Sequence, residues 1–216
     1  IFSFYYRQMI PMSVLNLAKI TPLNMHGSLL PKYRGRVPIN WAVLHGETKT
    51  GATLHVMAEK PDAGDIVAQQ AVPIGPHETA GEVFANVTAA AAATLKSVLP
   101  QLLMGDVPRR PNNLAEGSYF GGRKPEDGRI HWQQTAQQVY NLIRAVAPPY
   151  PGAFTDIQTT SGIQRITVNA ARPLDTPFEL KPGIYRIDSK VIGVCGDKMA
   201  VELTDFTPTT FDPTTL

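Results

Sequence analysis

The sequence predicts an α/β domain followed by a smaller, mainly β domain, and three observations support this. Within residues 1–110, apolar residues change between strand-like alternation and helical spacing, as in α/β proteins. From residue 153 onward, short strand-like pieces are separated by turn residues, which is typical of a small antiparallel barrel or sandwich. The intervening segment is loop-like and rich in charge and proline. We therefore predict a first domain over 1–110, a linker over 111–130 and a second domain over 131–216.

The first domain is predicted to alternate strands with helices. Pro11 and Pro38 suit the first position of a helix, where the missing N–H costs nothing, and Gly46 suits the end of the second helix. A third helix carries an apolar stripe at helical spacing, which indicates packing against a core. We expect that helix over 79–103, a buried strand over 1–5, and further strands over 23–26, 51–58 and 66–74.

The second domain is predicted to contain one helix and several strands. The helix, over 135–147, places Val139, Ile143 and Val146 on one side and ends where Pro148 and the prolines after it interrupt the helical hydrogen bonds. Strand-like pieces with turn residues between them follow along the rest of the chain. We expect these strands over 153–158, 163–170, 183–188, 190–195 and 199–204.

Composition limits the class of protein. Of 216 residues, 43% are hydrophobic and 18% are charged, which excludes an intrinsically disordered chain. The net charge of +2 is small for a dedicated nucleic-acid binder. The single cysteine, Cys195, cannot form an internal disulfide, and neither a secretory signal nor an uninterrupted apolar run of membrane-spanning length is present in the sequence. We therefore expect a cytoplasmic protein that does not insert in a membrane.

Asn24 and His26 form the first candidate for chemistry. Residues two apart in a strand point to the same face, so the amide and the imidazole can converge on one atom. An amide N–H can stabilise a developing oxyanion, and a histidine with its ordinary pKa near 6.5 can move protons at neutral pH. An Asn-x-His pattern alone is weak, because a lone histidine at a strand end more often has a structural role.

A basic loop follows this strand. The segment GSLLPKYRGR, residues 27–36, contains Lys32, Arg34 and Arg36 within five positions. Ligands of α/β sheets bind beyond the carboxyl ends of strands, and arginine suits carboxylate or phosphate groups. The loop is therefore a candidate anion clamp, and the alternative is an ordinary solvated basic loop.

Asp62, in the turn PDAGD, is the second candidate. A carboxylate beside His26 would favour the imidazolium form and raise the pKa of that histidine. The alternative is a turn-forming aspartate, which is common. The other histidines and the isolated cysteine have no common metal-ligand spacing, so no metal site is predicted; these residues are His45, His55, His77, His131 and Cys195.

Three segments together resemble the N10-formyltetrahydrofolate-dependent formyltransferases: NMHGSLLPKYRGRVPINW from residue 24, GATLHVMAEKPDAGDIV from 51 and IRAVAPPYPGAF from 143. The resemblance implies a Rossmann-like formyltransferase domain followed by an OB-like barrel. It implies N10-formyltetrahydrofolate as the formyl donor. It also implies catalytic roles for Asn24, His26 and Asp62, and donor contacts from Arg36, Ala58, Glu59, Lys60, Pro61 and Asp62.

The resemblance also indicates an acceptor. Gly27 and the segment GRVPINW are most similar to the branch that formylates nucleotide-linked amino sugars, in particular the UDP-4-amino-4-deoxy-L-arabinose formyltransferase domains of bifunctional polymyxin-resistance proteins, which act in lipid A modification. In those proteins a decarboxylating dehydrogenase follows, and a free-standing enzyme is equally compatible. The branch implies strands upstream of Ile1, so we expect this chain to be part of a longer protein. The oligomeric state is left open.

Two alternatives stay open. One keeps the chemistry and changes the acceptor to methionyl-tRNA, and the other is a non-catalytic OB-type protein that binds single-stranded nucleic acid. Residues 1–110 carry 10 basic and 7 acidic residues, whereas 111–216 carry 10 basic and 11 acidic. Phosphate contacts need lysine and arginine, so the slightly acidic second half disfavours both alternatives.

Overall fold

The computed structural model describes residues 1–6, 8–159 and 162–209, and the chain divides into two compact units. The first unit consists of Ile1–Ala42, Glu47–Pro76 and Glu82–Arg123. The second consists of the chain from Lys124 onward together with two short segments, Val43–Gly46 and His77–Gly81. The second unit therefore takes part of its structure from the first half of the sequence.

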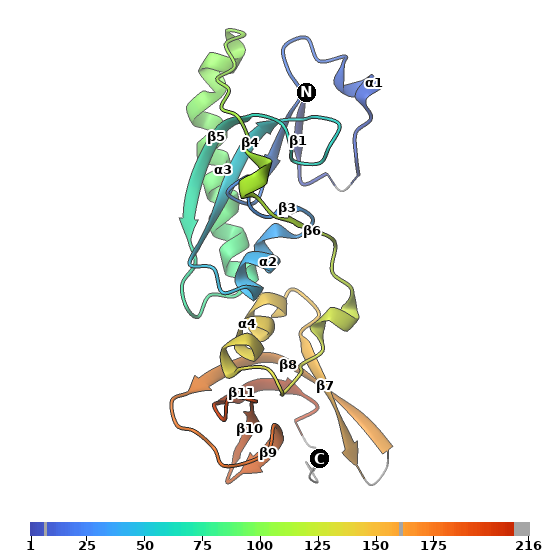
Figure 1. The fold of residues 1–216 in the computed structure, drawn as a ribbon, viewed down its shortest axis with the longest axis vertical. Helices are drawn as coiled ribbons and strands as arrows, with labels where there is room; N and C mark the ends of the chain where they lie inside the picture. The colour runs from blue at the N-terminus through green and yellow to red at the C-terminus, as the bar shows by residue number, and fades with distance from the viewer. Residues whose placement is uncertain (7, 160–161, 210–216) are drawn as a thin grey trace. The chain divides into compact units, whose positions relative to one another are not determined.

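A four-stranded mixed sheet forms the centre of the first unit (Figure 1), in the order β1-β2-β4-β5. Strands β1 and β2 are parallel, as in a Rossmann-like sheet, whereas β2–β4 and β4–β5 are antiparallel. The predicted α/β fold class is thus confirmed. The strands are β1 (Phe2–Phe4), β2 (Leu23–His26), β4 (Lys49–Val56) and β5 (Ile66–Pro73).

The prediction that the first strand is buried is wrong. Phe2 and Phe4 are 46% and 47% exposed, and only Ser3 between them is buried. Within the described residues β1 has a neighbouring strand on one side only, so it is an edge strand and its two phenylalanines are not covered.

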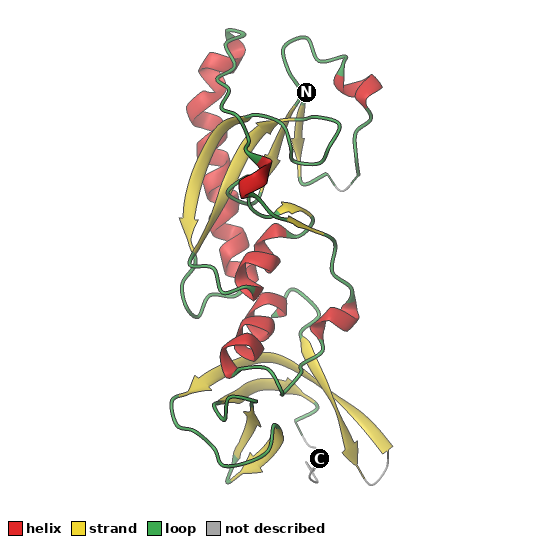
Figure 2. Ribbon diagram, in the orientation of Figure 1, coloured by secondary structure: helices red, strands yellow, loops and turns green. Residues whose placement is uncertain are grey.

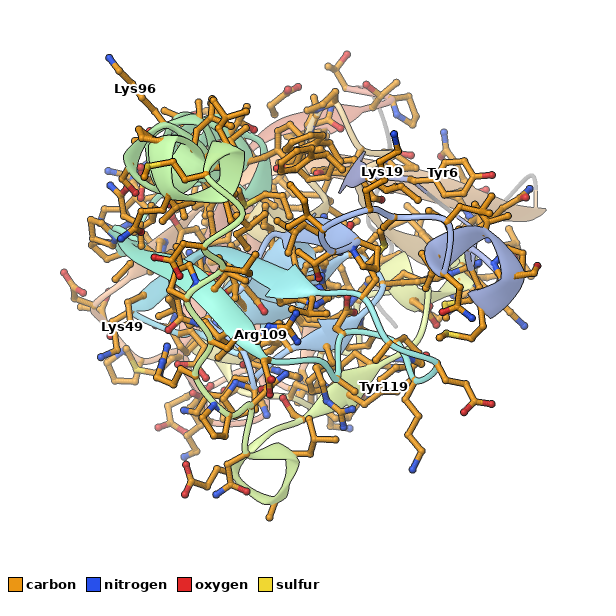
Figure 3. The ribbon with its side chains drawn as sticks, turned by 90° about the horizontal axis from the view of Figure 1, so that it is seen from above. Tyr6, Lys19, Lys49, Lys96, Arg109 and Tyr119 are labelled. Atoms are coloured by element: carbon orange, nitrogen blue, oxygen red, sulfur yellow. The ribbon has the colours of Figure 1, made fainter. Side chains whose placement is uncertain are left out.

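The sequence predicts all three helices of the first unit, although Pro11 precedes the first of them and is not its first residue. They are α1 (Met12–Leu15), α2 (Pro38–Leu44) and α3 (Ala80–Leu103). Gly46, just after α2, has φ +71°, a conformation that glycine adopts without strain. Helix α3 runs alongside the sheet (Figure 2), and the view from above shows it end-on to one side of the strands (Figure 3).

Helix α3 is long and apolar enough, by length and composition alone, to cross a membrane. The sequence shows no uninterrupted apolar run of that length, because polar residues such as Asn86 and Lys96 lie within the helix. One third of its most apolar stretch is buried inside the structure, and its buried residues recur every three or four positions. That spacing is typical of a helix packed on one side, and a core helix passes the same composition test. The buried residues are Ala80, Val83, Val87, Ala90, Ala91, Thr94, Val98 and Leu102.

The second unit is a curled antiparallel sheet with one helix, which confirms the predicted small barrel-like domain. The strand order is β7-β8-β11-β10-β9, so β7 and β9 are the edges. Helix α4 (Ala136–Val146) begins at Thr135, whose side chain accepts a hydrogen bond from Gln138 N. Its apolar face joins the core of the sheet. The strands are β7 (Ala153–Thr159), β8 (Gly162–Leu174), β9 (Gly183–Ile187), β10 (Lys190–Val194) and β11 (Ala200–Thr207).

Arg144 of α4 joins the short segments to the second unit. Its buried guanidinium donates to Asn141 Oδ1 at 2.9 Å, to the Glu78 carbonyl at 3.0 Å and to the Val43 carbonyl at 3.3 Å. We expect Arg144→Met to lower the free energy of unfolding by about 3 kcal/mol, because it removes three hydrogen bonds that a buried charged group donates. Urea unfolding followed by circular dichroism measures this, with the exposed Arg186→Met as the control. A loss no larger than that of the control would contradict the role.

Candidate active site

Strand β2 and its neighbour β4 bring the side chains of Asn24 and His55 together. In the antiparallel β2–β4 pair, Asn24 lies opposite His55. The Asn24 side chain donates from Nδ2 to His55 Nε2 at 3.1 Å, and His55 is only 2% exposed. His26 lies two residues further along β2 and is 7% exposed. The strand register, and not sequence proximity, therefore places these groups next to one another.

Asp62 reaches the same place from the turn between β4 and β5. Its backbone is in the left-handed region, with φ +49°, and contacts from two other segments hold it there. The Gly35 N–H donates to Asp62 Oδ2 at 2.9 Å, and Asn112 Nδ2 donates to the Asp62 carbonyl at 3.0 Å. Gly64 lies in the same turn, where a Cβ would be only 2.0 Å from the Val56 carbonyl oxygen. The turn is thus fixed in a conformation that directs the carboxylate toward β2 and β4.

The carboxylate of Asp62 lies between the two histidines. Its Oδ1 is 3.5 Å from His26 Nδ1 and 3.2 Å from His55 Nε2. The predicted proximity of His26 and Asp62 is therefore confirmed. His26 donates from Nε2 to the Tyr33 carbonyl at 2.7 Å, so Nδ1 is the nitrogen that can exchange a proton. We call Asn24, His26, His55 and Asp62 the polar cluster.

Burial and charge oppose one another at His26. Burial lowers the pKa of His26 below its ordinary value of 6.5, and the nearby Asp62 carboxylate raises it without outweighing burial. The expectation that Asp62 raises the pKa of His26 is confirmed as a contribution, and burial, which the sequence did not show, sets the direction of the net shift. Free His26 is therefore neutral at pH 7. Burial alone would raise the pKa of Asp62, but hydrogen bonds from His55 and from the Gly35 N–H lower it.

A short parallel ladder holds the basic loop over this site. Strand β3 (Arg34–Gly35) pairs with β6 (Tyr119–Phe120). Gly35 has φ +98°, and a Cβ there would lie 2.1 Å from the Phe120 carbonyl oxygen, so the close approach requires glycine. Tyr119, labelled in Figure 3, is 55% exposed. The loop is therefore anchored, and it is not a free solvated segment.

Aromatic side chains support the same loop. The Phe120 ring stacks on Tyr33 and on Trp41, with ring centroids 5.3 Å and 5.0 Å apart. Arg123 lies over the Trp41 ring at 5.0 Å. Tyr33 and Trp41 flank the basic loop in the sequence, where an aromatic ring could stack on a base or a pterin. In the structure both rings already pack against Phe120.

The residues expected to contact folate lie in two places. Arg36 is exposed, and its backbone N–H donates to the Phe120 carbonyl at 3.0 Å. The other residues precede Asp62 in its turn, with Ala58 and Pro61 half-buried and Glu59 and Lys60 exposed. Their contacts with folate stay predictions.

Sequence reasoning missed His55 and Asn112 as members of the site. His55 was considered only as a metal ligand, and in the described part of the chain no group of His, Cys, Asp or Glu is arranged to hold a metal ion. A signal was present, because a histidine stands in the otherwise apolar strand GATLHVMA. The register that places it opposite Asn24 could not be read from either segment alone. No sequence pattern indicated Asn112, since it lies in the loop that was assigned to the linker over 111–130.

The cluster and fold together define a class of protein. An amide donor with a buried imidazole–carboxylate pair, at the end of a strand in an α/β sheet, can catalyse acyl transfer to a nucleophile. Comparison with protein families is more specific: residues 1–99 match Formyl transferase, and residues 123–210 match Formyl transferase, C-terminal domain. The chain therefore belongs to the formyl transferase family of enzymes, as the sequence motifs predicted.

Solved structures share this fold. An N-formyltransferase from Helicobacter canadensis, in complex with folinic acid and dTDP-3-aminofucose, aligns over 94% of this chain and 72% of its own, with TM-score 0.76 and 20% identity. A 4-N formyltransferase from Francisella tularensis aligns over 78% of this chain and 69% of its own (TM-score 0.68, 26% identity). HypX from Aquifex aeolicus, in complex with tetrahydrofolic acid, aligns over 95% of this chain but only 35% of its own (TM-score 0.71, 22% identity).

Proposed function

We propose that this protein transfers a formyl group from N10-formyltetrahydrofolate to the amino group of a nucleotide-linked amino sugar. The observation that carries the proposal is the polar cluster, in which an amide donor, a neutral imidazole and a carboxylate lie within hydrogen-bonding reach of their neighbours. An attack by an amine on a formyl carbon requires a hydrogen-bond donor to the formyl oxygen and a base that takes the proton of the amine. It also requires a negative charge that stabilises the protonated base.

The reaction assigns one task to each side chain. The neutral amine of the sugar attacks the formyl carbon, the new C–N bond forms, and the π electron pair moves onto the formyl oxygen. An Asn24 N–H donates to that oxygen. His26 Nδ1 takes the proton that the amine loses, and the Asp62 carboxylate stabilises the imidazolium that forms. His26 then gives the proton to N10 of the folate as the bond between N10 and the formyl carbon breaks.

The choice of substrates rests on two kinds of support. Structures of similar fold were determined with folinic acid, 5-N-formyltetrahydrofolate or tetrahydrofolic acid, and two of them also with a dTDP-sugar or dTDP. Within amino sugars, Gly27 and the segment GRVPINW favour UDP-4-amino-4-deoxy-L-arabinose as the acceptor. A fused or separate dehydrogenase and a role in lipid A modification are further parts of this proposal.

An acceptor panel tests the function. Purified protein is incubated with N10-formyltetrahydrofolate and, separately, with UDP-4-amino-4-deoxy-L-arabinose, dTDP-linked 3-amino and 4-amino sugars, and methionyl-tRNA. Mass spectrometry then detects the added formyl group. We expect formylation of a nucleotide sugar, fastest for the UDP-arabinose compound. Formylation of methionyl-tRNA alone would overturn the proposed acceptor class.

Arg36 is expected to bind an anionic part of a substrate. Because it lies exposed on a loop, Arg36→Ala should leave the stability unchanged while raising the Kd for folinic acid or for the nucleotide sugar about tenfold or more, the value of a lost charge-assisted hydrogen bond. Calorimetry measures both affinities. The matched control is Lys49→Ala, an exposed cation on β4 (Figure 3). Unchanged affinity for both ligands would contradict a role of Arg36 in binding either substrate.

A further inference from the structure

We infer that Ser118 is a positioning residue, whose hydroxyl fixes the orientation of the Tyr33 carbonyl and so keeps the proton of neutral His26 on Nε2. This deepens the proposed function and rests on it, because it takes His26 Nδ1 as the base. Ser118 is 85 positions from Tyr33 in the sequence and comes directly before β6. None of the three sequence motifs includes it.

Two main-chain N–H groups of the basic loop donate to this one serine. The Tyr33 N–H donates to Ser118 Oγ at 2.9 Å, and the Arg34 N–H donates to the Ser118 carbonyl at 3.0 Å. These N–H groups belong to the peptide groups on either side of the Tyr33 Cα. Ser118 therefore restrains both backbone rotations of Tyr33, one through its hydroxyl and one through its carbonyl.

The restraint matters because the backbone of Tyr33 is strained. Its φ is +57°, in the left-handed region, which is unfavourable for a residue with a Cβ unless its surroundings hold it there. Without the hydroxyl, the Tyr33 N–H is free to rotate and the strain favours a turn of the peptide group between Tyr33 and Arg34. That peptide group carries the carbonyl to which His26 Nε2 donates at 2.7 Å. The hydroxyl of Ser118 thus acts on the His26 ring through Tyr33.

The Tyr33 carbonyl decides which nitrogen of neutral His26 is the base. A carbonyl can only accept, so it keeps the proton on Nε2 and leaves a lone pair on Nδ1. Asp62 acts in the opposite direction, since its Oδ1 is 3.5 Å from His26 Nδ1 and would accept a proton placed there. If the carbonyl turned away, Asp62 would favour the proton on Nδ1. A neutral ring in that form cannot take the proton of the amine at Nδ1.

Nitrogen-15 NMR of the histidine rings tests this without any measurement of activity. In the unaltered protein we expect neutral His26 with its proton on Nε2. Ser118→Ala keeps the carbonyl that accepts from Arg34 and removes only the hydroxyl, so a population with the proton on Nδ1 should appear. Ser118→Thr retains a hydroxyl and should restore the original form. A proton on Nδ1 in the unaltered protein, or an unchanged form in Ser118→Ala, would overturn the inference.

The matched control is Ser97→Ala. Ser97 is an exposed serine of α3, and its hydroxyl also bonds to the main chain, donating to the Thr94 carbonyl at 2.8 Å. Its replacement should leave the His26 ring, kcat and both KM values unchanged.

Kinetics test the effect on the reaction. Ser118→Ala should lower kcat about tenfold with little change in either KM, and Ser118→Thr should recover most of that loss. The hydrogen bond to Tyr33 and the charge of Asp62 raise the pKa of His26, whereas burial and the charge of His55 lower it. A weaker bond to Tyr33 therefore lowers this pKa, and the acidic limb of the rate profile should move to lower pH, because the neutral ring reacts.

A double variant separates this inference from the proposed function. In the His26→Gln background, Ser118→Ala should lower kcat by no more than about twofold further, because its effect passes through His26. Equal losses in both backgrounds would show a merely structural role and overturn the inference. An active His26→Gln variant would instead overturn the proposed mechanism. If Ser118→Ala fails to fold, the NMR measurement on the unaltered protein and on Ser118→Thr decides the question, since a folded Ser118→Thr with the proton on Nδ1 would also contradict it.

Discussion

Asn24→Ala and His26→Gln are each expected to lower kcat about 10²–10³-fold, the usual cost of losing an oxyanion donor or a general base. Asn24→Ala removes the N–H that stabilises the formyl oxygen. His26→Gln removes the group that takes the proton from the amine, yet it keeps a side-chain amide that can donate to the Tyr33 carbonyl, as His26 does at 2.7 Å. Steady-state formylation of the best nucleotide sugar measures both losses.

The replacement at His26 is glutamine because the side chain is buried. Truncation to alanine leaves folding intact only for a side chain that faces open solvent. His26 is only 7% exposed, and His26→Ala would leave a cavity and an unpaired carbonyl. Thermal unfolding of both variants must match that of the exposed control His131→Ala. Near-normal turnover of both variants would rule out the mechanism.

Asp62→Asn is expected to lower kcat about 10²-fold and to move the acidic limb of the rate profile to lower pH. The substitution keeps the shape of the side chain and removes its charge. The Asp62 carboxylate raises the pKa of His26, which burial lowers. Without the carboxylate, burial acts unopposed by that charge, so the pKa of His26 falls further. The imidazolium formed during the reaction also loses its counter-charge, which slows the reaction.

The direction of the pH shift follows from the state of His26 that reacts. The neutral ring takes the proton, so activity is lost as the pH falls through the His26 pKa, and a lower pKa extends activity to lower pH. Because the titrating side chains of the polar cluster interact, the acidic limb of the pH–rate profile reports an apparent pKa of the cluster as a whole. Asp65→Asn, the other carboxylate of the same turn, is the control and should leave the profile unchanged. An unshifted limb in Asp62→Asn would show that Asp62 acts only in the turn.

Local sequence determined most elements of this protein. The strand Leu23–His26 and the helix Pro38–Leu44 begin and end where alternation, a first-position proline and a following glycine predict. The order of an α/β part before a mainly β part follows from the same periodicities. The family could also be predicted from the sequence, because Asn24, His26 and Asp62 lie inside short motifs whose residues and spacing are specific in combination.

Only the tertiary structure decided how those motifs act together. Strand register places His55 opposite Asn24, and a distant loop supplies Asn112 to the Asp62 turn, so neither contact can be read from nearby residues. The net pKa of His26 is also a tertiary property, because burial depends on every segment that covers the ring. The sequence identified the Asp62 carboxylate and predicted that it attracts the His26 imidazolium. The free-energy cost of removing water from the imidazole, however, arises only once the chain has folded around it.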